Sequence, residues 1–92
     1  MSDRAEEVRS QIQAQKSSIA DLKQQIDSIG SSIHYAGGNC VANCVQWNEH
    51  QKDKQDEVER MNAQLDEQEK HLEEMQDTAR KQGFGSSVYD PE

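Results

Sequence analysis

Apolar residues in the first third of the chain recur at alternating steps of three and four. The series is Ala5, Val8, Ile12, Ile19, Leu22, Ile26, Ile29 and Ile33, with Gln15 as the one polar residue that takes a place in it. This seven-residue repeat places a narrow apolar seam along a helix, which is the pattern of a left-handed coiled coil. We predict a helix over residues 3–35.

From the middle of the chain onward, a second series follows the same repeat. The first position of each repeat holds Cys44, Gln51, Val58, Leu65, Leu72 and Ala79, and the fourth holds Trp47, Lys54, Met61, Gln68 and Met75. The seam is apolar from Val58 onward, but Gln51 and Lys54 interrupt it before that point. We predict a second helix over residues 40–82, terminated by Gly83, because glycine is the commonest residue just beyond a helix end.

The two seams supply a small core. Its expected members are Val8, Ile12, Ile19, Leu22, Ile26, Ile29, Ile33, Val58, Met61, Leu65, Leu72 and Met75. Apolar residues make up only 32% of the chain, below the roughly 45–50% that is usual for globular proteins. A single hairpin would bury one seam per helix, so we expect the protein to dimerise into a four-helix bundle.

Residues 36–39 are expected to form the turn between the helices. Each glycine of the Gly37-Gly38 pair costs about 1 kcal/mol in a helix interior relative to alanine. Asn39 suits the N-cap of a helix that starts at Cys40, because its side chain accepts hydrogen bonds from free main-chain N–H groups.

The predicted fold is all-α, an antiparallel coiled-coil hairpin over residues 1–82 with a flexible C-terminal tail over residues 83–92. Facing residues in such a hairpin have numbers with a constant sum, and sums of 80 and 73 both place first positions opposite fourth positions. The alternative is a parallel coiled-coil dimer of one long interrupted helix. Ile33 and Cys44 are eleven residues apart, a spacing that a continuous supercoiled helix can absorb.

Residues 28–48 contain no charged side chain of the Asp, Glu, Lys or Arg type, although these make up 30% of the chain. The same window holds both cysteines and the only tryptophan. Tyr35, Val45 and Trp47 would form an apolar patch there, and aromatic anchors dominate the energetics of many interfaces. We expect a protein partner to bind these three residues. For Trp47, which takes a fourth position of the repeat, packing into the end of the core is favoured over exposure, and Tyr35 is the better candidate for an exposed residue.

Cys40 and Cys44 are the residues best suited to chemistry. On a helix that starts at residue 40, both thiols share one face near the helix N-terminus, which favours the thiolate. Two such pairs that meet across a dimer would supply the four sulfurs of a tetrahedral zinc site, and His34 could fold back across the turn to join it. Packing of the small thiols at the end of the hairpin is favoured over this metal site, and a disulfide between chains is a further alternative. A Cys40–Cys44 disulfide within one helix would be strained, so we do not expect it.

The cysteine pair resembles the zinc hook at the coiled-coil apex of the SMC-like DNA-repair ATPases. The resemblance covers only residues 40–44, and the hook has a Cys-x-x-Cys spacing where this chain has three intervening residues. It implies zinc as the metal that such a site would bind. Beyond zinc, no cofactor is expected.

The net charge is −8, and residues 49–92 carry thirteen acids and six bases. An acidic chain is poorly suited to direct binding of nucleic acid or of an anionic membrane surface. No apolar run approaches the roughly 20 residues of a membrane span. The chain has no glycine-rich phosphate loop with a basic residue and no catalytic group of residues that a pocket would enclose, so we expect no enzyme.

These observations favour a non-enzymatic interaction or assembly protein, such as an adaptor, a small chaperone or a scaffolding subunit. Its expected partners are a second copy of itself and a protein bound through the uncharged tip or the acidic second helix. Two alternatives stay open: a metal- or redox-responsive dimerisation module that uses Cys40 and Cys44, and an acidic inhibitor of a basic nucleic-acid-binding protein. Residues 1–10 lack the apolar stretch of a secretion signal, so we expect a cytoplasmic protein with reduced cysteines.

Overall fold

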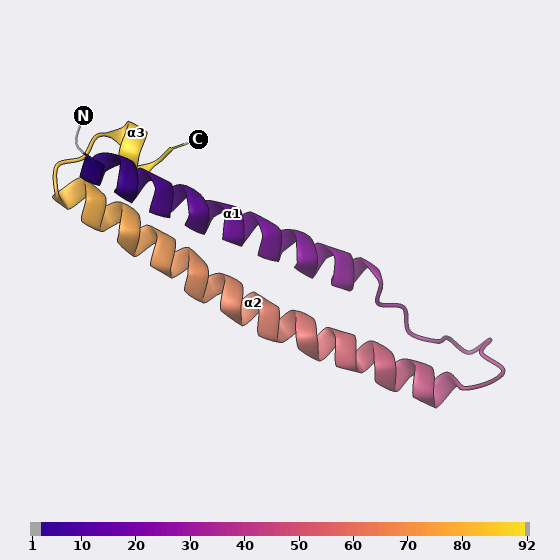
Figure 1. Ribbon diagram of the computed structural model, residues 1–92. Helices are drawn as coiled ribbons and strands as arrows, with labels where there is room; N and C mark the ends of the chain where they lie inside the picture. The colour runs from indigo at the N-terminus through magenta and orange to yellow at the C-terminus, as the bar shows by residue number, and fades with distance from the viewer. Residues whose placement is uncertain (1–2, 92) are drawn as a thin grey trace.

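Two long antiparallel helices form a rod. The computed structural model describes residues 3–91. Helix α1 spans Asp3–Ser31, helix α2 spans Cys44–Lys81, and a short helix, α3, spans Ser86–Tyr89; the described residues contain no strand. Figure 1 shows α1 and α2 side by side along a rod with extents of 67 × 17 × 15 Å. The predicted all-α helical hairpin is confirmed, and the alternative of one long interrupted helix is wrong.

Helix α1 ends four residues earlier than predicted, at Ser31. The hydroxyl groups of Ser31 and Ser32 donate hydrogen bonds to the main-chain carbonyls of Ser28 and Ile29, at 3.1 and 2.7 Å. The Ser32 N–H also bonds to the Ile29 carbonyl at 3.0 Å, which tightens the last turn. Serine hydroxyls that bond the nearby main chain compete with the helical hydrogen bonds, and apolar periodicity does not report this competition.

Helix α2 begins at Cys44 instead of Cys40. Asn43, immediately before it, has a φ of 60° and a ψ of 23°, the left-handed conformation. That conformation interrupts a right-handed helix, and asparagine is one of the few residues besides glycine that adopts it readily. The connection between the long helices therefore covers residues 32–43, three times the length of the predicted turn over residues 36–39.

The best-buried part of the core lies in the half of the rod that holds the chain ends. Ile12, Ile19 and Leu22 of α1 and Ala79 of α2 are buried. The other nine of the twelve predicted core residues are only half-buried. Ile12 has no exposed surface, because α3 packs on both α1 and α2 at this end and adds a third layer. Towards the loop, two helices alone leave the seam partly open.

The register of the two helices differs from both predicted registers. The Gln15 side chain donates a hydrogen bond from Nε2 to the Gln68 carbonyl at 3.2 Å, and these residue numbers add to 83 rather than 80 or 73. A sum of 80 would have placed Gln15 opposite Leu65 and Gln68 opposite Ile12. The bond satisfies the Gln15 amide through the main chain, whereas the side-chain Oε1 of Gln68 is buried without a hydrogen-bond partner.

The C-terminal end of α2 has the predicted glycine terminator. Gly83 has a φ of 90° and follows the C-cap residue Gln82. The Gly83 N–H bonds to the Arg80 carbonyl at 3.0 Å, and the Phe84 N–H bonds to the Ala79 carbonyl at 3.1 Å. These are the two bonds of a Schellman motif, which satisfies carbonyls at the end of a helix.

Two glycine-to-alanine substitutions are expected to change stability in opposite directions. Gly83→Ala forces a side chain into the left-handed region and should lower the free energy of unfolding by about 1–2 kcal/mol. Gly30→Ala, in the last turn of α1 with open space around its Cα, should raise it by about 0.5–1 kcal/mol, because alanine leaves the unfolded chain fewer conformations to lose. Urea denaturation followed by circular dichroism measures both, and a Gly83→Ala variant that is as stable as the wild type would contradict the Schellman geometry.

The prediction of a flexible tail over residues 83–92 is wrong for its described part, residues 83–91. Helix α3 contacts both long helices. The Lys16 ammonium group bonds to the Asp90 carboxylate at 2.5 Å and to the Pro91 carbonyl at 3.0 Å, and Pro91 is buried. The Arg80 guanidinium lies 5.9 Å from the centre of the Tyr89 ring. The tail thus closes the terminal end of the hairpin.

Asp77 forms ion pairs near the end of α2, with Arg80 at 2.7 Å and Lys81 at 2.9 Å. Hydrogen bonds from Arg80 and then Lys81 hold the pKa of the Asp77 carboxyl below its usual value. Because folding favours the ionised carboxylate, the stabilisation is present above the unfolded-state pKa and is lost as the pH falls through the folded-state pKa. The effect is small, since all three side chains face solvent.

Candidate interaction surface at the hairpin tip

The hairpin tip, residues 32–51, consists of the loop and the first two turns of α2. These turns extend beyond the end of α1, and the loop runs back along them (Figure 1). Two hydrogen bonds fix the loop there: the His34 N–H donates to Gln51 Oε1 at 2.9 Å, and the Ala36 N–H donates to Asn48 Oδ1 at 2.6 Å. The tip is therefore an ordered structure rather than a short turn.

Three side chains from one face of α2 hold the loop. Trp47 donates from Nε1 to the His34 carbonyl at 2.5 Å, next to the bonds made by Asn48 and Gln51. Main-chain groups outside helices need such partners. Gln51, the polar residue that interrupts the apolar seam, is completely buried, and its side chain accepts the hydrogen bond from the loop. Sequence reasoning missed this role; the signal was a polar residue at a seam position beside the loop.

All large apolar side chains that are exposed in the described residues lie at the tip. They are Tyr35, Val41, Val45 and Trp47, with exposed fractions of 53%, 97%, 71% and 49%. The structure thus places the three predicted partner-binding residues on one end of the rod, and Trp47 also holds the loop. Val41 was missed by sequence reasoning, although it stands between the two cysteines in the uncharged window. Partner binding at these residues stays a prediction.

Cys40 and Cys44 form a disulfide, contrary to the prediction of free thiols. The described residues contain no free cysteine. The bond does not lie within one helix, because the left-handed Asn43 makes α2 begin at Cys44 and leaves Cys40 in the loop. The Cα atoms of the two cysteines are 6.0 Å apart. A sulfur in a disulfide is not a thiolate, so in this form the pair cannot supply the expected zinc ligands.

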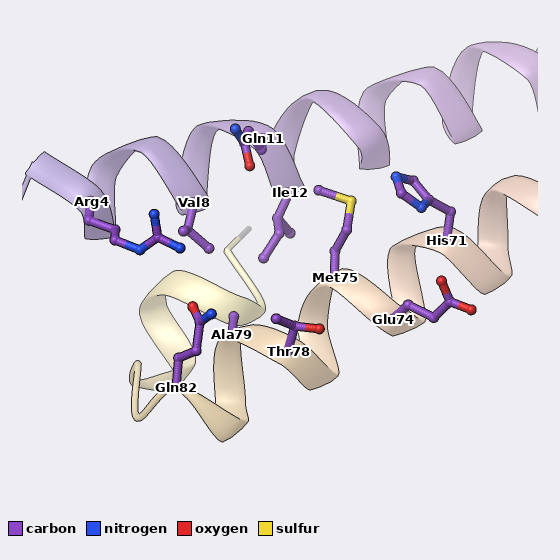
Figure 2. A pocket seen from close by; sticks show the side chains of 10 residues that line it. All are labelled: Arg4, Val8, Gln11, Ile12, His71, Glu74, Met75, Thr78, Ala79 and Gln82. Carbon is purple, nitrogen blue, oxygen red and sulfur yellow. The ribbon is translucent and has the colours of Figure 1, made fainter.

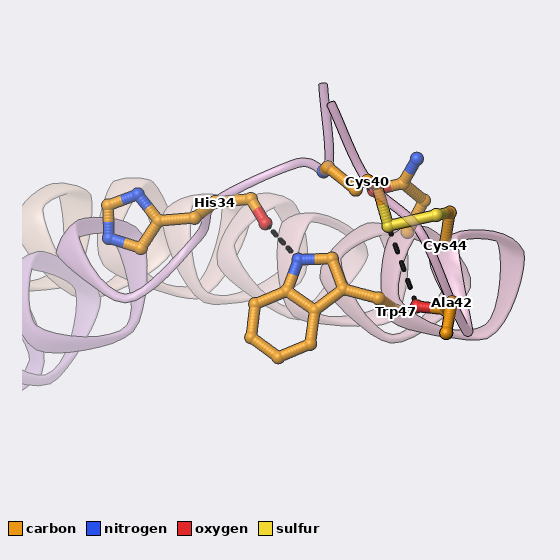
Figure 3. The surroundings of a disulfide bond; sticks show 7 residues. His34, Cys40, Ala42, Cys44 and Trp47 are labelled. Carbon is orange, nitrogen blue, oxygen red and sulfur yellow. Dashed lines mark hydrogen bonds between the residues drawn. A yellow bond between two sulfur atoms is a disulfide. The ribbon is translucent and has the colours of Figure 1, made fainter. Parts of the chain in front are cut away.

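His34 does not complete a metal site with the cysteines. Figure 3 shows its imidazole pointing away from the two sulfurs, while its carbonyl oxygen faces the indole of Trp47. Within residues 3–91, no group of three or more His, Cys, Asp or Glu side chains is arranged to hold a metal ion. The geometry gives no support to the predicted zinc site at Cys40, Cys44 and His34.

A shallow groove begins at the apolar tip and continues along the outer face of α2. It has a volume of about 630 Å³. Its lining residues are Tyr35, Val45, Asn48, Glu49, Lys52, Gln55, Asp56 and Glu59. Apolar side chains stand at one end of this tip groove, and carboxylates follow. A smaller depression of about 290 Å³ lies at the opposite end of the rod, where Val8 and Ile12 of α1 point towards Met75 and Ala79 of α2 (Figure 2).

Comparisons of the chain with protein-family models, with curated proteins and with solved structures find no match. In the part of the chain that the structure describes, no helix is both long enough and apolar enough to cross a membrane. Function must therefore be argued from the tip itself.

Proposed function

We propose that the protein is a non-enzymatic interaction or assembly protein that binds a protein partner through its tip. The observation that carries the proposal is the gathering of all exposed large apolar side chains of the described residues at residues 35–47. Exposed apolar clusters on small soluble proteins commonly mark interaction sites. An adaptor or scaffolding role suits a rigid rod, because the tip is presented far from the chain ends (Figure 1).

The test is capture of a partner from the native source with wild-type protein and with Val41→Asp/Val45→Asp. Both valines point to solvent, so the double variant should keep its helix content while losing the captured protein at least tenfold. The matched control is Ser17→Asp/Ala20→Asp, on the exposed surface of α1. Equal capture by the two double variants would reject the tip as the binding surface.

We also propose that the hairpin self-associates, most simply as a dimer that forms a four-helix bundle. The nine half-buried seam residues support this, since further burial of each apolar side chain contributes at roughly 25 cal/mol per Å². Sedimentation equilibrium at micromolar concentration should give a mass of at least two chains of 10.5 kDa. A stable single-chain mass over this range would contradict the proposal.

A redox-responsive module is the second candidate function, and the Cys40–Cys44 disulfide favours it over a metal-dependent one. A dithiol reductant would break this S–S bond by exchange, with two electrons and two protons passing to the cysteines and a disulfide left on the reductant. Cys40 and Cys44 are the sequence neighbours of Val41 and Val45, so reduction of the disulfide would change the position of these two exposed side chains at the tip. A cytoplasmic location stays a prediction, and the disulfide weighs against it because such bonds are rare in reducing compartments.

A further inference from the structure

We infer that the tip groove is the docking site for a helical segment of the partner that carries one large apolar anchor followed by basic residues. This inference rests on the proposed function and adds the chemistry of the partner. It combines three features of the groove: its straight course along α2, its prearranged apolar end and its unpaired carboxylates.

The groove follows a straight strip of α2. Residues 45, 49, 52, 56 and 59 line it at alternating steps of four and three. This spacing places the five residues in one line along the helix, on a face of α2 other than the one that packs against α1. At 1.5 Å per residue the strip is about 21 Å long, or about four helical turns. A groove of this form accepts a helix laid along it, as in helix-in-groove recognition.

The apolar end of the groove is held in place before any partner binds. Tyr35 lines this end from the loop and Val45 lines it from α2. The loop on both sides of Tyr35 is fixed, through the His34 N–H bond to Gln51 and the Ala36 N–H bond to Asn48. A preorganised pocket loses less conformational freedom on binding, which favours a single aromatic or aliphatic anchor from the partner.

The rest of the groove selects for positive charge. Glu49, Asp56 and Glu59 line it against one base, Lys52, and none of these four forms an ion pair within residues 3–91. Lys and Arg on the docked face of the partner helix would pair with the three carboxylates and set its register.

A second copy of this chain is a poor occupant of the groove. Residues 49–92 carry thirteen acids and six bases, so two copies that meet along α2 would bring like charges together. Self-association through the open seam between α1 and α2 uses a different face and is compatible with docking here.

The experiment is selection of binding peptides from a random display library whose members are long enough for about four helical turns. Selected peptides should carry an aromatic or aliphatic residue followed by Lys or Arg on one helical face. They should bind the full chain at least tenfold more weakly after Glu49→Lys/Asp56→Lys, and also after Tyr35→Ala. The matched control is Asp66→Lys/Glu73→Lys, which makes the same charge change at the same spacing on α2 outside the groove. Circular dichroism checks that each variant folds.

Equal weakening by the two charge-reversal variants would overturn the inference, since it would reveal non-specific attraction to an acidic chain. Selected peptides without basic residues would overturn it as well. A change in sedimentation mass with Glu49→Lys/Asp56→Lys alone would assign the groove to a second copy instead. If Val41→Asp abolishes partner capture while the groove variants retain it, the proposed tip function stands and the groove inference fails.

Discussion

Replacing Ile12 with alanine is expected to lower the free energy of unfolding by about 2–5 kcal/mol, the range for deleting a fully buried aliphatic side chain. Ile12 has no exposed surface and lies where α1, α2 and α3 meet. Small domains are stable by only about 5–15 kcal/mol, so this one change should move the urea midpoint markedly. Circular dichroism at 222 nm, the helix band, follows the transition.

The matched substitution is Ile26→Ala, at the same position of the heptad repeat two repeats later. In the single hairpin Ile26 is only half-buried, and the loss scales with the area removed from water, so at protein concentrations too low for the proposed dimer it should cost at most about half as much. Equal losses at such concentrations would contradict uneven burial in the hairpin, whereas a loss that grows with protein concentration would show that a second copy covers Ile26.

The sequence was sufficient to predict the two long helices, and it favoured their reversal over one long interrupted helix. Its heptad spacing runs without a slip from Ala5 to Ile33, and such a pattern favours helix over strand for the segment. Gly83 likewise predicted the end of α2, because a left-handed residue is needed there. These features depend on local periodicity and backbone preference, which can be inferred from a single sequence.

The helix ends at the tip and the register depend on contacts between distant segments. The loop is fixed by side chains of α2, above all Gln51, and a heptad analysis reads that residue only as a break in the seam. The pairing of Gln15 with Gln68 could be found only by asking where each polar seam residue finds a partner. In both cases the hydrogen bond joins a side chain to the main chain of a distant segment, and Gln51 Nε2 and Gln68 Oε1 stay buried without a partner, so the pattern of apolar positions does not report either contact.

The prediction of a flexible tail missed the short helix α3 and its packing on the long helices. Phe84 and Val88 are four residues apart, and both are half-buried together with Tyr89. That spacing signalled a short apolar face. At the tip, the uncharged window located the exposed surface correctly. The disulfide was excluded only because Cys40 was assigned to a helix that in fact starts at Cys44.

Cys40→Ser/Cys44→Ser is expected to lower the free energy of unfolding by about 2 kcal/mol, the chain-entropy value for a closed loop of five residues. We further expect the tip to rearrange. Without the bond, Asn43 is free to take a right-handed conformation, and Asn39 becomes the N-cap of a helix that starts at residue 40. The Cα chemical shifts of residues 40–43 should then become helical, both in the double variant and in the reduced wild-type protein.

This rearrangement connects the disulfide to function. Val41 is almost fully exposed on the closed loop, and an added helical turn would carry it to a new position relative to Val45 and Tyr35. Partner capture should therefore fall at least several-fold on reduction, while the double variant should capture weakly with or without reductant. If chemical shifts and capture are both unchanged by reduction, the bond is a staple of the loop and the redox-responsive function is rejected. Capture that falls equally on reduction for the wild type and for a double variant that otherwise binds fully would instead trace the loss to an effect of the reductant on the partner.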